Sequence, residues 1–457
     1  MYNLSDTITS ICTPTGKGAI AAIRVSGEKS WEIARKIFCL SSNRNNPYKD
    51  LDLQHMKAVY GFIKDEKGII IDEVILLPFK SPNSFTTEDV IEIFCHGGIR
   101  IPGLILDVTM SHGARKAHNG EFTFRAFVNG RIDLTEAEAV NELINADSEK
   151  FIYSASNVLS GALKNKIAEF REKLFDLITS IESSIEFPSD VPSVNKDFIA
   201  EKLNEINSEI NSLIESSKEG QILRNGIKVS IVGLPNAGKS SLLNQLLENQ
   251  RAIVSEEPGT TRDTIEEKII VEGYPIVLID TAGIREKFVS DSEKMGIERS
   301  KRAIESSDIV MLVYDLAAET DSSINEITSS LSNKTKIIIG NKLDLVNGDM
   351  KNCDIAISAK YGKNIDKLKK LILEKVNLSS SASQSLIPIY INQRQKELLL
   401  QCYSSVKQAI DTADKNISDD LISDELKKAV SKLDEISGRV INETVIQNIF
   451  AKFCIVK

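Results

Sequence analysis

The sequence predicts an α/β domain that is inserted into an all-α domain, with an α+β domain before both. Three changes in the pattern of apolar residues along the 457-residue chain lead to this prediction. Residues 1–117 alternate short β-rich runs with Gly, Pro and Asn turns, and the spacing becomes helical from about 134 to 219. At Asn225-Gly226 apolar runs begin to alternate with helical patterns, and residues 392–457 are helical again. Because helical segments flank the α/β stretch, that stretch is predicted to be an insertion.

The N-terminal region is predicted to contain four strands bounded by turn residues. They cover Ala19–Val25, Val59–Ile63, Ile69–Leu77 and Val90–Phe94. The helical region carries two apolar stripes with spacings of three and four residues, each indicating one long helix. The stripes are Leu163, Ile167, Phe170, Leu174, Leu177, Ile181 and Ile185, then Ile199, Leu203, Ile206, Ile210 and Leu213. Phe187-Pro188-Ser189-Asp190 is predicted to end the first of these helices.

The α/β stretch contains short apolar runs typical of buried parallel strands. These runs are Gly226–Val232, Ile276–Asp280, Ile309–Tyr314, Lys336–Gly340 and Asp354–Ile357. After them, the Ser-rich segment Leu378–Ser385 is predicted to be a linker back to the helical region.

Composition narrows the possible functions. The net charge of −9 argues against a chain-wide basic surface for nucleic acid, so any such contact needs a local patch or a partner. The longest apolar runs are far shorter than the roughly 18–20 residues that span a bilayer, and residues 1–10 do not resemble a signal peptide. The six cysteines include no CxxC pair, which argues against a disulfide framework or zinc cage. We therefore expect a soluble, cytoplasmic protein.

One motif indicates a phosphate site. Gly233-Leu-Pro-Asn-Ala-Gly238-Lys239-Ser240 fits GxxxxGK[ST] between a predicted strand and a predicted helix, Ser240–Leu247. Glycines in this loop let backbone N–H groups surround phosphate oxygens at a helix N-terminus. Lys239 is expected at the β- and γ-phosphates, and the Ser240 hydroxyl at Mg²⁺.

Three further motifs follow in order and point to guanine nucleotides. Asp280-Thr-Ala-Gly283 follows a strand, where the Asp can hold Mg²⁺ through water. In Asn341-Lys342-Leu343-Asp344 the carboxylate can accept hydrogen bonds from guanine N1–H and its 2-amino group, which adenine lacks. Ser358-Ala359-Lys360 would support the base from the next loop. The predicted nucleotide-binding residues are Gly233, Asn236, Ala237, Gly238, Lys239, Ser240, Ser241, Ser255, Thr260, Thr261, Asp280, Thr281, Ala282, Gly283, Asn341, Lys342, Asp344, Ser358, Ala359 and Lys360.

The residues for hydrolysis are less obvious from these motifs. Many small GTPases place a Gln after DxxG to orient water, but this chain has Ile284 there. Asn236 offers an amide oxygen beside the phosphates, a possible ligand for a monovalent cation in place of an arginine finger. A turn-stabilising Asn is the alternative. Thr261 is the expected switch threonine that completes Mg²⁺ coordination.

The flanking segments resemble the MnmE (TrmE) family of tRNA-modification GTPases nearly from end to end. The resemblance rests on Asp6-Thr-Ile8, Cys12–Ile20, Arg24-Val-Ser-Gly27, Ser84–Ile93, His96-Gly-Gly98, Gly120–Gly130 with Asp133-Leu134 and Ala137-Glu-Ala139, and a terminus, Ile449–Lys457, similar to the family's FCIGK ending. Together with the motifs above, it implies an α/β P-loop GTPase domain inserted in an all-α helical domain, preceded by an α+β N-terminal domain. The implied segments are 1–118, for folate binding and dimerisation, 119–221 and 381–457, the two parts of the helical domain, and 222–380, a Ras-like G domain.

The resemblance also implies an activity. Family members are homodimers that act with a FAD-dependent flavoprotein, MnmG (GidA), in a heterotetramer. Together they add a carboxymethylaminomethyl or aminomethyl group to C5 of the wobble uridine of certain tRNAs. A tetrahydrofolate, in its 5-formyl or 5,10-methylene form, supplies one carbon, and GTP hydrolysis requires K⁺ and Mg²⁺.

Carried over residue by residue, the resemblance implies four groups of site residues. The K⁺ ligands would be Asn236, Ser255, Glu257 and Thr260, and the Mg²⁺ ligands Ser240 and Thr261. Glu293 would position the attacking water, and Asn236 would be a second catalytic residue. The folate residues would be Arg24, Glu88, Arg131 and Lys457. Cys454 would act in the chemistry, because a thiolate can add to C6 of uracil and activate C5; a small apolar residue near a terminus is the alternative.

The sequence departs from the family pattern at three positions. Val456 replaces the Gly of FCIGK, Thr87 replaces a Gly before Glu-Asp, and Asn119 replaces the Pro of PGEF. Two other functions stay open: a regulatory GTPase in ribosome assembly, and a family member that has lost the modification chemistry.

Overall fold

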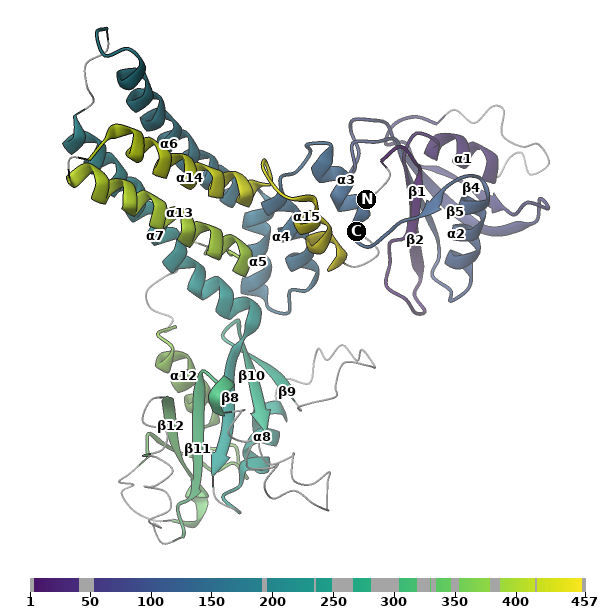
Figure 1. Cartoon of the computed structure of the whole chain (residues 1–457). Helices are drawn as coiled ribbons and strands as arrows, with labels where there is room; N and C mark the ends of the chain where they lie inside the picture. The colour runs from purple at the N-terminus through teal and green to yellow at the C-terminus, as the bar shows by residue number, and fades with distance from the viewer. Residues whose placement is uncertain are drawn as a thin grey trace, which may run out of the picture. The chain divides into compact units, whose positions relative to one another are not determined.

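The computed structural model describes most of the chain, which divides into two compact units (Figure 1). The described residues are 4–40, 53–190, 195–233, 236–248, 266–280, 304–318, 329, 334–346, 353–378, 387–415 and 417–453. The first unit comprises Met1–Asn145, Ser156–Ser212 and Gln393–Lys457, and the second Ala146–Ala155 and Leu213–Asn392. No helix in the described part of the chain is long and apolar enough to cross a membrane.

A seven-stranded sheet forms the N-terminal part of the first unit. Its order is β3-β4-β5-β6-β2-β1-β7, and its pairs are antiparallel apart from β1 with β7. The strands are β1 (Ile8–Ile11), β2 (Ile20–Ser26), β3 (Phe38–Leu40), β4 (Val59–Lys64), β5 (Ile70–Phe79), β6 (Val90–His96) and β7 (Arg115–Lys116). The four strands predicted from sequence are confirmed as β2, β4, β5 and β6, each within a few residues of its expected bounds.

Two helices, α1 (Ser30–Ile37) and α2 (Ile101–Ser111), cover one face of this sheet. Side chains alternate along a strand, so Ala21, Ile23 and Val25 of β2 pack into the core with these helices. The intervening Arg24 therefore lies on the other face, opposite Glu92 of β6. This alternation places charged groups of β2 and β6 on the face that the helices leave open.

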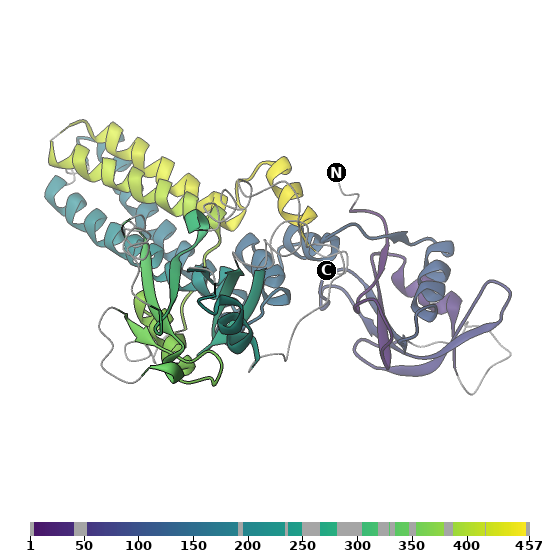
Figure 2. The ribbon, with the colours of Figure 1, turned by 90° about the horizontal axis from the view of Figure 1, so that it is seen from below.

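The remainder of the first unit is helical. It contains α3 (Glu121–Val128), α4 (Leu134–Ile144), α6 (Ala162–Glu186), α13 (Gln393–Asp414), α14 (Asp419–Ser437), α15 (Glu443–Ala451) and the first half of α7 (Lys196–Asn225). Asp133 begins α4 with a capping box to Glu136. Figures 1 and 2 show α13 and α14, in yellow-green, running side by side, and α14 packs against α6.

The predicted stripe of α6 is buried from Leu163 to Ile181, and the helix ends before Phe187 as expected. The stripe was predicted one residue too long, because Ile185 in the last turn is 37% exposed. The stripe predicted for α7, from Ile199 to Leu213, is buried throughout.

The second unit is built on a six-stranded sheet of order β13-β12-β11-β8-β10-β9. Its strands are β8 (Ile227–Gly233), β9 (Glu266–Val271), β10 (Tyr274–Asp280), β11 (Ile309–Asp315), β12 (Thr335–Asn341) and β13 (Ile355–Ala356). All neighbours are parallel except β9 and β10. With α8 (Lys239–Glu248), the 3₁₀ turn η1 (Leu343–Leu345) and α12 (Ile365–Lys375), this arrangement confirms the predicted α/β domain.

The start of helix α5 (Glu149–Leu159) belongs to this second unit. The ammonium of Lys150 lies 3.9 Å from the centre of the Tyr274 ring, next to the β9–β10 turn. The Tyr274 hydroxyl pairs with Glu219 of α7, and Phe151 meets Tyr390 edge to face with ring centres 5.1 Å apart. Residues far from the sheet in sequence thus pack against it. Residues 379–385 of the predicted linker lie outside the described residues.

Candidate functional site

The phosphate loop begins where β8 ends, between its parallel neighbours β10 and β11. Gly233 is required here, because a Cβ atom at this position would lie 2.0 Å from the carbonyl oxygen of Val313. Gly238 has φ +87° and a Cβ there would lie 2.2 Å from the Asn341 amide nitrogen. Lys239 then opens α8, and its ammonium donates to the Gly233 carbonyl at 3.1 Å. The lysine therefore folds back over the loop in which phosphates are expected.

Asn341 joins the predicted phosphate loop to the loop that carries Ser358-Ala359-Lys360. It ends β12 and is 2% exposed. Its Nδ2 donates to the Ala237 carbonyl at 2.9 Å, and its Oδ1 accepts the Ala359 N–H at 3.0 Å. Three motifs that are widely separated in sequence therefore meet at one buried amide.

Asp344, the residue predicted to read guanine, is held by the same loop. The Ser358 hydroxyl donates to Asp344 Oδ1 at 2.5 Å. A carboxylate that is fixed by one hydroxyl can still accept from a base edge through its remaining lone pairs. The arrangement suits a ligand that presents adjacent N–H donors.

Asp315, which sequence reasoning did not identify, pairs with Lys342. Asp315 ends β11, and its Oδ2 lies 2.6 Å from Lys342 Nζ. Burial raises the pKa of Asp315, but the hydrogen bonds from Lys342 and from the Ala317 N–H outweigh it and lower that pKa. Its position at the carboxyl end of a central parallel strand is the signal that could have identified it.

Several predicted residues lie outside the described residues. They are Ser255, Glu257, Thr260, Thr261, Thr281, Ala282, Gly283, Glu293, Cys454, Val456 and Lys457. Asp280 ends β10 in register with Ile231 of β8, and its side chain is not among those described. Asn236, at φ +61°, Ser240 and Ser241 are exposed at the phosphate loop, whereas Lys360 is exposed after β13.

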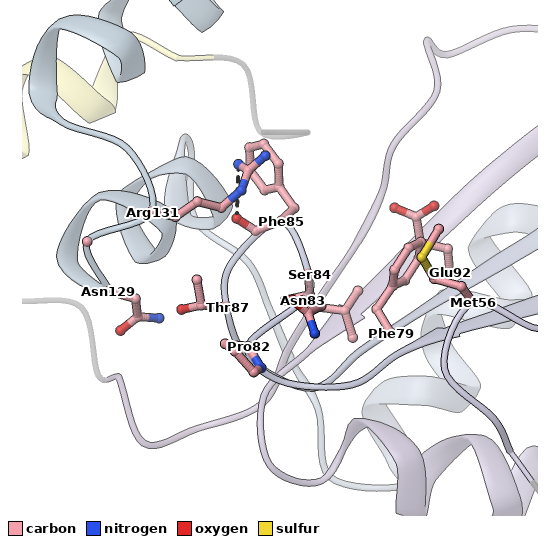
Figure 3. Close-up of a pocket in the computed structure, with 12 residues that line it drawn as sticks. Met56, Phe79, Pro82, Asn83, Ser84, Phe85, Thr87, Glu92, Asn129 and Arg131 are labelled. Carbon is pink, nitrogen blue, oxygen red and sulfur yellow. Dashed lines mark hydrogen bonds between the residues drawn. The ribbon is translucent and has the colours of Figure 1, made fainter. Parts of the chain in front are cut away.

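The N-terminal part of the first unit contains a pocket of about 550 Å³. Its lining includes Phe79, Phe85, Thr87, Glu92, Asn129 and Arg131 (Figure 3). Arg24 lies beside it, since Nε and Nη2 donate to Glu92 Oε1 at 2.9 and 2.7 Å. Two of the four residues predicted for folate, Arg24 and Arg131, thus come together around Phe85.

Glu88, the third residue predicted for folate, is turned toward the protein interior. Its carboxylate accepts from Arg125 Nη1 at 3.0 and 3.2 Å and from the Ser26 hydroxyl at 2.6 Å. Arg125 is fully buried and also pairs with Asp6 and Glu121. Sequence reasoning missed this buried arginine, because its partners come from three separate segments.

Two family models match the chain in succession. The model of the "GTP-binding protein TrmE N-terminus" covers residues 7–131, and that of the "MnmE helical domain" covers residues 134–454. A tRNA modification GTPase MnmE from Moorella thermoacetica is 40% identical over 99% of this chain and 100% of its own length. The chain belongs to the MnmE family.

Other members of the MnmE family match equally completely. The protein of that name from Acetivibrio thermocellus is 39% identical over the whole of both chains, and that from Thermotoga petrophila is 37% identical over 99% of this chain and 100% of its own. A solved G domain of the T. maritima FeoB iron transporter covers 33% of this chain and 98% of itself, at 23% identity and a TM-score of 0.25. Membership of the MnmE family rests on the full-length relatives and the two family models.

Proposed function

We propose that the chain is a K⁺-dependent GTP hydrolase that modifies the wobble uridine of certain tRNAs. The enzyme class, a GTP hydrolase, follows from membership of the MnmE family. The observation that carries the nucleotide-binding part of the proposal is the bridge by Asn341 between Ala237 of the predicted phosphate loop and Ala359 of the predicted base loop. This bridge supports binding of a guanine nucleotide, because it joins the loop predicted at the phosphates to a loop predicted at the base.

Different residues would bind the phosphates and the guanine base of GTP. Lys239 would exchange its contact with the Gly233 carbonyl for the β- and γ-phosphate oxygens. Backbone N–H groups at the start of α8 would face the same anions. Asp344 would accept from guanine N1–H and the 2-amino group, while Lys342, held by Asp315, would lie next to the base. Glu293 would orient the attacking water.

We propose two metal sites around the phosphate loop. The exposed Ser240 hydroxyl at the first turn of α8 is free to face Mg²⁺, with Thr261 as its second protein ligand. Asn236 is exposed on the phosphate loop, where its amide oxygen would join Ser255, Glu257 and Thr260 around K⁺. These ions would neutralise the charge that develops on the phosphates. Equal GTP turnover in NaCl and KCl would remove K⁺ from the proposal.

We propose the pocket in the first unit as the tetrahydrofolate site. It combines the carboxylate of Glu92 with the cation of Arg131 and the rings of Phe79 and Phe85. A reduced pterin offers N–H donors and a flat apolar body, and its glutamyl tail is anionic. Lys457 would add a second cation. Glu88 would not contact the ligand directly but would support the pocket through its hydrogen bonds with Arg125 and Ser26.

Cys454 is proposed to act on the uracil ring. Its thiolate would add to C6, which makes C5 nucleophilic toward the one-carbon unit, and would leave again when the product forms. We propose that a FAD-dependent flavoprotein, MnmG, completes the reaction in a heterotetramer in the cytoplasm.

We propose that the chain forms a homodimer through one face of the N-terminal sheet. On the sheet face opposite α1 and α2, Tyr60 pairs across strands with Ile75, and these side chains are 53% and 45% exposed. Exposed apolar side chains that adjoin on one sheet face are typical of an interface. Tyr60→Asp should shift the chain from dimer to monomer in light scattering, whereas Tyr361→Asp, also exposed, should not.

The deciding experiment is nucleoside analysis of tRNA from a deletion strain. Loss of the modified wobble uridine, restored by the natural chain, is the expected result. Unchanged nucleosides with defective ribosomal particles would favour a ribosome-assembly GTPase instead. Unchanged nucleosides and normal particles would favour a family member that has lost the modification chemistry. Val456, two residues from Cys454, is the reason for considering this alternative.

A further inference from the structure

Two arginines contact the same aromatic ring in the N-terminal pocket. The guanidinium carbon of Arg24 lies 5.0 Å from the centre of the Phe85 ring, and that of Arg131 lies 4.8 Å from it. Arg131 Nη1 also donates to the Phe85 carbonyl at 3.3 Å, as the dashed line in Figure 3 shows. Phe85 therefore contacts Arg131 through both its ring and its backbone carbonyl.

The two arginines differ in their counter-charges. Arg24 makes two hydrogen bonds to one oxygen of Glu92, and its side chain is 18% exposed. Within the part of the chain that the structure describes, no carboxylate lies within ion-pair distance of Arg131, which is exposed. Arg131 is thus the cation of this pair that keeps its charge available to a ligand.

Glu92 and Arg131 lie on different sides of the pocket (Figure 3). Apolar side chains, among them Phe79 and Met56, lie near the Glu92 side. A ligand that fills the pocket would place N–H donors and an apolar ring toward Glu92 and an anionic end toward Arg131. This polarity is that of a folate with its glutamyl tail.

We propose that Phe85 is a positioning residue that holds Arg131 at the pocket, where it binds the anionic tail of the ligand. This inference rests on the proposed folate site and deepens it, since it assigns the tail to one cation. A cation held against a ring loses less rotamer freedom on binding than a free side chain does. Without the ring, the long Arg131 side chain would pay this ordering cost when the ligand binds.

The test is calorimetric binding to the full-length chain with two ligands. One ligand is 5-formyltetrahydrofolate, and the other is 5-formyltetrahydropteroate, which lacks the glutamate. Phe85→Leu should weaken binding of the first about three- to tenfold and leave that of the second within twofold. Phe85→Tyr, which keeps the ring, should bind both ligands as the natural chain does.

A second comparison separates positioning from a merely structural role. In an Arg131→Gln background, Phe85→Leu should cause no further loss, because the cation that it positions is gone. Additive losses, or equal weakening for both ligands, would show that Phe85 shapes the pocket and would overturn the inference. Phe175→Leu, an exposed ring on α6, is the control for loss of an aromatic side chain.

Failure of the inference is distinguishable from failure of the proposed function. Binding of 5-formyltetrahydrofolate by the natural chain, unchanged in Phe85→Leu, overturns the inference alone. No binding by the natural chain overturns the folate site and the inference with it. If Phe85→Leu and Arg131→Gln both weaken tRNA binding but not folate binding, the cation serves a phosphate and the inference is wrong.

Discussion

The guanidinium of Arg125 holds the carboxylate of Glu88, with Nη1 donating to both of its oxygens at 3.0 and 3.2 Å. Arg125 is fully buried on α3, while Glu88 lies in the loop before β6. A buried guanidinium needs carboxylate partners, because an uncompensated charge in the interior is costly. This contact fastens the pocket loop to the helix that follows the sheet.

Glu88→Gln should destabilise the chain by about 1–3 kcal/mol, since it leaves part of the Arg125 charge unpaired. Chemical denaturation of the natural chain and the variant measures the difference. Glu32→Gln, which removes an exposed i,i+4 pair with Lys36, is the matched control and should leave the stability almost unchanged. Equal stabilities for all three would contradict the account of the Arg125 cluster.

Acid should weaken the same cluster through Glu121. Burial raises the pKa of Glu121, but hydrogen bonds from Arg115 and the His118 N–H outweigh it and lower that pKa below its usual range. A carboxyl with a lowered native pKa stabilises the fold fully above its unfolded pKa and loses this contribution as pH falls through the native value. The melting temperature should therefore fall between pH 6 and pH 3, and it should fall less steeply in Glu121→Gln. Parallel curves for the two proteins would refute this role.

Thr87→Gly should stabilise the chain by about 0.5–1 kcal/mol. Thr87 has φ +62°, a left-handed conformation that is strained for a β-branched residue and open to glycine. Relief of strain exceeds the extra entropy that glycine has in the unfolded chain. Thermal unfolding measures the change, and Thr87→Ala, which keeps a Cβ atom, should bring much less of the gain. A lower melting temperature for Thr87→Gly would show that the Thr87 side chain contributes more than its backbone costs.

Asp315→Asn should weaken GDP binding about fivefold, because Lys342 loses the carboxylate that holds it. Fluorescence titration with a labelled GDP measures the affinity. Asp366→Asn lies in the same domain, is 92% exposed at its side chain, and should bind GDP as the natural chain does. Unchanged affinity in Asp315→Asn would show that Lys342 is placed by its backbone alone.

Much of the fold could be predicted from local patterns. The stripe of α6 and the central strands of the second unit repeat over enough residues for periodicity to identify them. Short elements could not be predicted this way. β7 has two residues, and its pairing with β1 joins segments that lie more than 100 positions apart, so no local signal specifies it.

The sites divide along the same line. The phosphate and base motifs could be predicted from sequence because each is contiguous and lies at a strand end. The folate residues depend on tertiary contacts, which a motif does not reveal. Glu88, just before β6, faces Arg125, whereas Glu92, within β6, faces the pocket. Phe85 and Asp315 were not predicted, because their contacts with Arg131 and Lys342 are visible only in the structure.

The contact of Lys150 with Tyr274 has a consequence for anyone who dissects this chain. A fragment cut at residues 222 and 380 would lack Lys150, Glu219 and Tyr390, and Tyr274, which is 6% exposed, would lose its cover. Such a fragment should therefore unfold at a lower temperature than one that keeps the whole of the second unit, residues 213–392 with residues 146–155. Residues 146–155, added as a separate peptide or joined by circular permutation, should restore part of this stability.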